Sequence, residues 1–113
     1  MVNYPGKTTR ESIALKLDRY LLNPFHENGK HKAKWFKTAL GFTIQNRDLL
    51  AQQIKFDPDK AIFLRRCLHG WIYKQNIDII GVTGKTIPIT FEWIINRDGV
   101  IRLVTAKRFP KKR

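Results

Sequence analysis

The 113-residue sequence is poor in the residue types that build disulfides and metal sites. Its one cysteine, Cys67, cannot form an internal disulfide, and this usage fits a reducing cytoplasm. Its 3 histidines include no His-x-x-x-His pair, so the ligand spacing of a zinc site is missing. We therefore expect a cytoplasmic protein that binds no metal ion and needs no cofactor.

Long hydrophobic runs and nucleotide-binding loops are also missing. No apolar run approaches the length of a membrane span, and the opening MVNYPGKTTRES lacks the apolar segment of a signal peptide. Residues 81–86, GVTGKT, end like a phosphate-binding loop, but only Val82 and Thr83 separate glycines that such a loop spaces by four residues. We expect a hairpin turn there, and no association with a membrane.

Positive charge is what the sequence has in excess. Lys and Arg number 22 against 9 Asp and Glu, which gives a formal net charge of +13. A hydrophobic fraction of 42% and an aromatic fraction of 12% indicate a packed core rather than a disordered basic tail. Because such charge repels itself, a polyanionic partner is the simplest reason to keep it, and nucleic acid is the commonest one.

The first part of the chain is predicted to be mainly helical. Residues 1–12 are polar and are expected to form a flexible lead-in. In the following segment the alternation of Ile13, Leu15 and Leu17 suits a short strand, whereas Asp18 could cap a short helix, so both structures stay open. Asn23-Pro24 ends the element in either case.

Two further helices are predicted from periodicity and capping residues. Residues 30–40 place their apolar side chains mainly on one face, and Gly41 is suited to end the helix. A second helix is expected from a cap at Thr43 or Asn46 to about residue 56, before the helix-breaking Asp57-Pro58-Asp59.

From residue 60 the period changes towards two, which predicts strands at 61–68, 71–80, 85–95 and 100–105. Short connections imply an antiparallel meander with the helices ahead of it, an α+β architecture in one domain spanning residues 13–106. Pro88 inside the third strand should mark an edge, a bulge or a break. Residues 107–113 are expected to form a basic tail.

The segment HENGKHKAKWF, residues 26–36, is rich in side chains that could take part in catalysis or binding. RNA carries its own nucleophile, the 2′-OH, so cleaving it needs only proton transfer and stabilisation of the phosphate charge. Histidine suits the first task and lysine the second, and His26, Lys30, His31 and Lys32 supply both. The simpler alternative is a solvated basic helix face. Trp35 and Phe36 are better explained as core residues.

Two stretches resemble a known family. The strings YLLNPFHENGKHKAKWF…LGF, from Tyr20 to Phe42, and WIINRDGVIRLVTA, from Trp93 to Ala106, are similar to a small uncharacterised bacterial domain family. Its members stand alone, notably in cyanobacteria, or form the C-terminal tips of polymorphic and contact-dependent toxins. The resemblance covers roughly residues 13–106.

Such toxin tips resemble the barnase, EndoU, colicin and RelE-like ribonucleases, so the resemblance implies helices followed by a four-stranded antiparallel sheet. It also implies a metal-independent ribonuclease that acts on tRNA or other RNA. At matching positions the resemblance implies that His26 is a general base or acid and that Lys32 stabilises the phosphate charge. It implies that Thr105 hydrogen-bonds to the phosphate or sugar. An acidic antitoxin or immunity protein is the implied protein partner.

The residues expected to contact nucleic acid form a wider set: Lys30, His31, Lys34, Lys37, Arg65, Arg102 and Trp93. Trp93 is ambiguous, because it shares a strand face with Ile89 and Phe91, and core packing explains it equally well. Two other functions remain open: a non-catalytic nucleic-acid-binding module, and a structural or phage-derived protein whose charge serves packing against nucleic acid.

Overall fold

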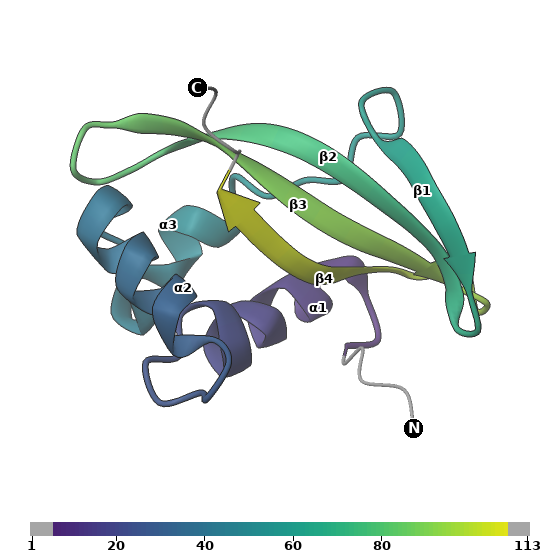
Figure 1. Ribbon diagram of the computed structural model, residues 1–113, viewed down its shortest axis with the longest axis horizontal. Helices are drawn as coiled ribbons and strands as arrows, with labels where there is room; N and C mark the ends of the chain where they lie inside the picture. Colours follow the sequence, from purple (N-terminus) through teal and green to yellow (C-terminus); the bar gives the residue numbers. More distant parts are fainter. Residues whose placement is uncertain (1–5, 109–113) are drawn as a thin grey trace.

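The computed structural model describes residues 6–108 and places the helices ahead of a four-stranded antiparallel sheet (Figure 1). The helical part comprises α1 (Thr9–Lys16), η1 (Leu17–Leu21), α2 (Lys30–Trp35), η2 (Phe36–Leu40), η3 (Ile44–Asn46) and α3 (Arg47–Ala51). The sheet comprises β1 (Ile62–Cys67), β2 (Gly70–Ile80), β3 (Thr86–Asn96) and β4 (Ile101–Arg108), hydrogen-bonded in that order. The predicted α+β class is confirmed.

The segment that the sequence left open between strand and helix is helical. Thr8 caps α1, since its hydroxyl accepts a hydrogen bond of 3.1 Å from the backbone N–H of Glu11. The π-helical turn η1 continues α1, and Ile13, Leu17 and Leu21 are buried along the combined helix. Because α1 begins at Thr9, the end of the expected flexible lead-in was placed too late.

The helix predicted over residues 30–40 is present as α2 followed by the π-helical turn η2. Gly41 ends it in the left-handed conformation, with φ of 79°, as its position predicted. The carbonyl of Leu40 then accepts a hydrogen bond of 2.9 Å from Val82 in the β2–β3 turn. This bond ties the end of the helix to the sheet.

The next helix is shorter than predicted. Thr43 and Asn46 form a capping box, but α3 ends at Ala51 rather than near residue 56. Two glutamine side chains explain the early end. The amide of Gln53 exchanges two hydrogen bonds with the backbone of Ile80, and the buried amide of Gln75 does the same with the backbone at residues 55 and 57. The bonds of Gln75 satisfy backbone groups at residues 55 and 57 that a longer helix would otherwise satisfy.

The strands follow the predicted positions with small shifts at their ends. Pro88 lies opposite Asp78 of β2 and just beyond Ile89, the last residue of β3 that pairs with β4. It therefore occupies an edge position, as expected for a residue without an N–H. β4 extends to Arg108, so the start of the expected basic tail is strand, and residues 109–113 lie outside the described part.

The core lies between the helices and one face of the sheet. Ile89, Phe91 and Trp93 of β3 are fully buried and pack against apolar side chains of the helical part. β1 lies at the far edge of the sheet, away from the helices (Figure 1), and Ile62, Phe63 and other residues of this strand are exposed. The helical layer is thus centred on the other edge strand, β4.

The free edge of β4 is covered by α1. The backbone N–H of Leu103 donates a hydrogen bond of 3.0 Å to the hydroxyl of Ser12, and Ser12 is fully buried. An edge strand has backbone groups without a strand partner, and this hydroxyl provides one of them with an acceptor. α1 is thereby fixed against the sheet.

Replacing Ser12 with Ala should therefore destabilise the protein by about 1–3 kcal/mol, because the N–H of Leu103 would be buried without an acceptor. Urea denaturation of wild type and variant measures the change in the free energy of unfolding. Thr38→Ala, at an exposed hydroxyl of η2, is the matched control. Equal stability of the two variants would show that the buried hydrogen bond contributes nothing.

Candidate nucleic-acid site

The three residues proposed for catalysis, far apart in the sequence, line one cleft. His26 comes from the loop before α2, Lys32 from α2 and Thr105 from β4, and all three border a hollow of about 600 Å³. The rest of its lining is mostly basic or aromatic and includes Lys16, Arg19, Tyr20 and Lys107. The structure therefore brings together the residues to which the resemblance assigned a common role.

A β-bulge at Val104 turns Thr105 towards this cleft. Across the β3–β4 pair, Trp93 is opposite Leu103 and Glu92 is opposite Thr105, so Val104 is the extra residue. Without it, alternation would place Thr105 on the buried face beside Leu103. With it, Ala106 takes the buried position and Thr105 lines the cleft.

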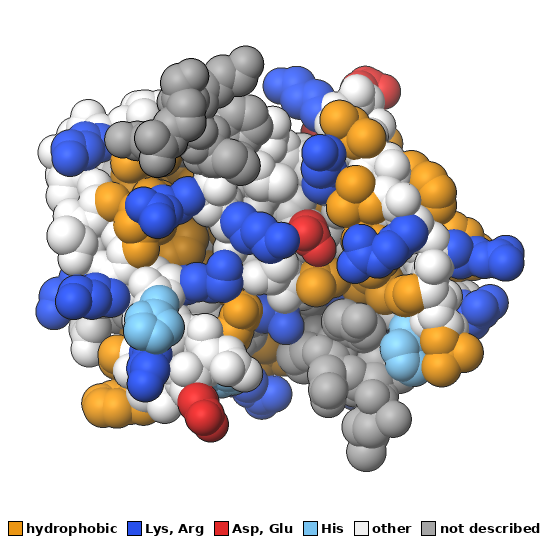
Figure 2. Space-filling view, viewed as in Figure 1, with side chains coloured by type: hydrophobic (Ala, Val, Ile, Leu, Met, Phe, Trp, Pro, Cys, Tyr) orange, Lys and Arg blue, Asp and Glu red, His pale blue; other side chains and the backbone are white. Residues whose placement is uncertain are grey.

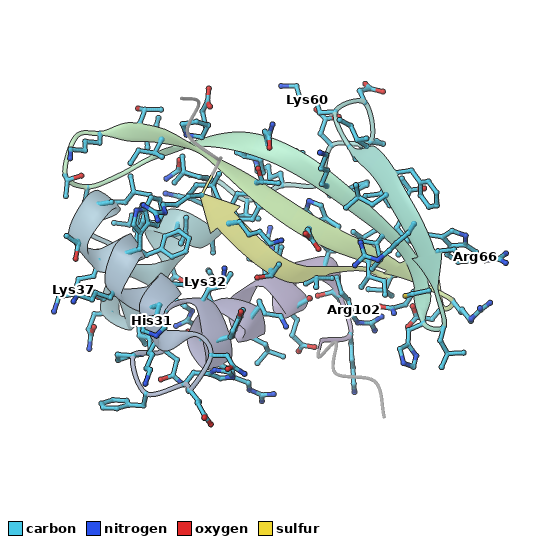
Figure 3. All side chains as sticks on the ribbon, viewed as in Figure 1. His31, Lys32, Lys37, Lys60, Arg66 and Arg102 are labelled. Atoms are coloured by element: carbon cyan, nitrogen blue, oxygen red, sulfur yellow. The ribbon has the colours of Figure 1, made fainter. Side chains whose placement is uncertain are left out.

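Lys32 reaches from α2 to the edge of β4. Its ammonium group donates a hydrogen bond of 3.0 Å to the carbonyl oxygen of Ala106, and Figure 3 shows Lys32 lying between the helical layer and β4. Burial lowers the pKa of Lys32 below 10.5, and the positive charge of Lys107 lowers it further, while Glu92 acts in the opposite direction. The cleft thus contains a cation that gives up its proton more readily than an exposed lysine.

Lys107 lines the cleft and is paired with Glu92, although the sequence singled out neither residue. Their side chains form an ion pair with an N–O distance of 3.4 Å, and the side chain of Glu92 is only 16% exposed. The sequence placed Lys107 in the expected basic tail and gave no prediction for Glu92. Their roles depend on the bulge, which puts Thr105 opposite Glu92.

The hydrogen bonds of His26 define which of its nitrogens faces outward. Nδ1 accepts hydrogen bonds from the backbone N–H groups of Asn28 (3.0 Å) and Gly29 (2.9 Å). A nitrogen that accepts hydrogen bonds carries no proton, so these bonds assign the proton of neutral His26 to Nε2. The ring also lies edge-on to Tyr20, with 5.0 Å between ring centroids. This arrangement suits a hydrogen-bond donor at Nε2 better than a base.

Two of the wider set of predicted contacts have structural roles instead. Trp93 is 0% exposed and packs edge-on against Phe56, so it cannot stack on a base and belongs to the core. Arg102 donates hydrogen bonds to Gly6, Asn96 and Asp98, and its bonds to Asp98 are the main cause of the lowered pKa of that carboxyl group. Its guanidinium is occupied in holding the β3–β4 turn.

The remaining predicted contacts lie on two separate surfaces. Arg65 is exposed on β1, at the sheet edge opposite the cleft. Lys30, His31, Lys34 and Lys37 are exposed on α2 and η2. In Figure 3, His31 and Lys37 lie away from β4, whereas Lys32 lies towards it. The structure therefore divides the predicted basic patch between the two sides of one helix.

The viewed face of the molecule in Figure 2 bears many Lys and Arg side chains and few acidic ones. Within residues 6–108, no three His, Cys, Asp or Glu side chains come together as metal ligands would. No helix in this part of the chain is long and apolar enough to cross a membrane. Positive charge around a cleft is thus the main chemical character of the site.

Residues 10–112 match the model of a protein family described as a domain of unknown function, DUF6883. The chain belongs to this family. No curated protein matches the DUF6883 chain. Among solved structures it is similar to a chain of a contact-dependent growth inhibition toxin–immunity protein complex from Klebsiella pneumoniae 342, with a TM-score of 0.63 and 17% identity. The match covers 83% of this chain and 94% of the other.

At this identity the likeness shows a shared fold. It confirms the coarser part of the predicted resemblance, which is an uncharacterised family whose fold also occurs in a toxin–immunity complex. The likeness of the DUF6883 chain to barnase-type ribonucleases stays a prediction.

The electrostatics of the cleft can be tested residue by residue. In NMR titrations that follow lysine side-chain signals, Lys32 should titrate at lower pH than an ordinary lysine, whose pKa is 10.5. Lys107→Ala should raise the pKa of Lys32, because a neighbouring positive charge is removed, and Glu92→Gln should lower it. If Lys32 titrates like an ordinary lysine and neither substitution changes its pKa, Lys32 is not in the environment described.

Proposed function

We propose that this DUF6883 domain is a toxin-like, metal-independent ribonuclease whose active site is the cleft between α2 and β4. The observation that carries the proposal is the meeting of His26, Lys32 and Thr105 in one basic cleft. The fold shared with a chain of a toxin–immunity complex supports the toxin-like role. The substrate is RNA, because the chemistry uses the 2′-OH as nucleophile. Among RNAs, tRNA is the first candidate.

In the proposed reaction the 2′-oxygen attacks the adjacent phosphorus, and the bond from phosphorus to the 5′-oxygen breaks. Glu92, opposite Thr105, accepts the proton of the 2′-OH. Lys32 and Lys107 stabilise the charge on the phosphate, and Lys32, with its lowered pKa, gives a proton to the leaving oxygen. Nε2–H of His26 and the hydroxyl of Thr105 donate hydrogen bonds to phosphate or sugar oxygens.

A protein partner follows from the same proposal. A cytoplasmic ribonuclease would damage the cell that makes it, so an inhibitor is needed. The net charge of +13 makes an acidic immunity protein or antitoxin the complementary partner. The similar solved structure is itself a toxin–immunity complex, which supports a partner of this kind.

A non-catalytic RNA-binding module is the second candidate, and two observations favour it. The ammonium group of Lys32 already holds the edge of β4, and His26 already caps the turn before α2. In that case both residues serve the fold, and the exposed lysines bind phosphates. Activity assays separate the two functions.

The decisive assay incubates wild-type protein with total tRNA in the presence of EDTA. We expect cleavage, and a loss of roughly 10²-fold or more in Glu92→Gln, because proton transfer of this kind contributes about that much. His26→Asn keeps an oxygen that can accept the turn hydrogen bonds but loses Nε2–H, so it should also be slower while remaining folded. Lys60→Gln, which removes an exposed charge far from the cleft, is the control.

Intact tRNA after incubation with wild-type protein would contradict the nuclease proposal and leave the binding module. Cleavage by Glu92→Gln at the wild-type rate would contradict the role of Glu92 alone.

The dependence of the cleavage activity on pH follows from the protonation of Lys32. It acts as a cation, and its pKa lies below 10.5 because burial disfavours the charged form. Activity should therefore be present below that lowered pKa and be lost as the pH rises through it. Lys32→Arg should keep its residual activity over the same range, because arginine stays protonated. If wild-type activity instead rises through this range and Lys32→Arg is inactive, Lys32 acts as a base.

A further inference from the structure

A second hollow lies on the other side of α2 from the proposed active site. It has a volume of about 650 Å³ and an apolar floor that includes Leu22, Ala33, Phe42 and Ile44. Phe25 lies at its border with 92% of its surface exposed. Among the other described phenylalanines, Phe36, Phe42 and Phe91 are buried, Phe56 is partly buried and Phe63 is exposed. An aromatic side chain as fully exposed as Phe25 is unusual.

One wall of this groove is positively charged. Lys30, Lys34 and Lys37 follow one another at helical spacing along α2 and η2, and His31 lies beside them. Residues at that spacing lie on one face of a helix, roughly 5–6 Å apart. No acidic side chain lines the groove within the described part of the chain. The groove therefore combines a row of cations with an apolar floor and an exposed aromatic ring.

We propose that this groove binds an unpaired segment of the RNA substrate. Its phosphates lie along the lysine row, and one of its bases stacks on Phe25. This is the combination by which proteins hold single-stranded nucleic acid, because every base presents an aromatic face once it is unpaired. The inference rests on the proposed ribonuclease function and adds to it that the substrate is single-stranded beside the cleavage site.

A third hollow shares lining residues with both the groove and the cleft. It is smaller, with a volume of about 210 Å³, and is lined by His31, Lys32 and Arg108, among others. His31 also lines the groove, and Lys32 also lines the cleft. In the middle, the guanidinium of Arg108 lies 5.5 Å from the ring centre of Trp35. An RNA chain bound in the groove can follow this line of cations to the cleft.

An acidic, partly apolar protein segment is the alternative occupant of such a groove. The geometry favours RNA because the cations continue from the groove into the cleft, where the proposed chemistry takes place. An acidic peptide is therefore included in the test as a competing ligand.

The test measures binding of a fluorescent, unstructured oligouridine of about ten nucleotides by anisotropy, at fixed salt and with EDTA. The proteins carry Glu92→Gln so that the RNA stays intact. Adding Phe25→Ala should weaken binding roughly 5- to 150-fold, the effect of losing one stacked base. Lys34→Glu with Lys37→Glu should weaken it further and reduce its salt dependence. Lys60→Glu, at an exposed lysine on the opposite side of the molecule, should have a smaller effect than either groove lysine changed singly to Glu.

A blunt-ended RNA duplex without unpaired bases provides the second arm, and Phe25→Ala should not change its affinity. The inference is overturned if Phe25→Ala binds oligouridine like its parent, or if it loses affinity for a polyglutamate peptide and not for RNA. These outcomes are separate from the cleavage assay. Cleavage by wild-type protein without an effect of Phe25→Ala on binding contradicts RNA binding in the groove and supports the ribonuclease function. An effect of Phe25→Ala without cleavage supports RNA binding in the groove and contradicts the ribonuclease function.

Discussion

The hydrogen bonds that cover the free edge of β4 hold this structure and its candidate site together. Ser12 of α1 accepts from the N–H of Leu103, and Lys32 of α2 donates to the carbonyl of Ala106. The bulge at Val104 shifts the alternation of β4 by one residue, so that the carbonyl of Ala106, like the N–H of Leu103, lies on the free edge. Two helices that are separate in sequence are thereby attached to one strand, and the opposite edge strand, β1, is left exposed.

The same arrangement creates the cleft. The bulge moves Thr105 out of the core, and the bond to Ala106 places Lys32 beside it. Partial burial at this edge lowers the pKa of Lys32, and Glu92 and Lys107 complete a group of opposite charges. α2 then separates two hollows, with Lys32 on the side of the cleft and the row of exposed lysines on the side of the groove. One helix thus serves both proposed steps, holding the RNA chain and acting on its phosphate.

Much of the fold could be predicted because local signals and tertiary structure agree. The helix over residues 30–40 has helical periodicity and a glycine at its end, and the strands have a period of two with turn residues between them. α3 was predicted too long because the backbone at residues 55 and 57 bonds to Gln75 of β2, a contact that exists only in the folded state. The bulge at Val104 has no local sequence signal, so Glu92 and Lys107 were missed, and Trp93 could not be assigned to the core until its burial was known. His26, Lys32 and Thr105 came from a resemblance between short motifs, and spacing alone would not have joined them.

The central claim is that the cleft beside β4 cleaves RNA by attack of its own 2′-OH. Mass spectrometry of the ends produced from tRNA in EDTA tests this claim most directly. The mechanism predicts 2′,3′-cyclic phosphate on one product, 5′-hydroxyl on the other, and no reaction when the 2′-oxygens are methylated. Products with 5′-phosphate ends, or cleavage of the methylated RNA, would contradict the account, because both require a nucleophile other than the 2′-OH.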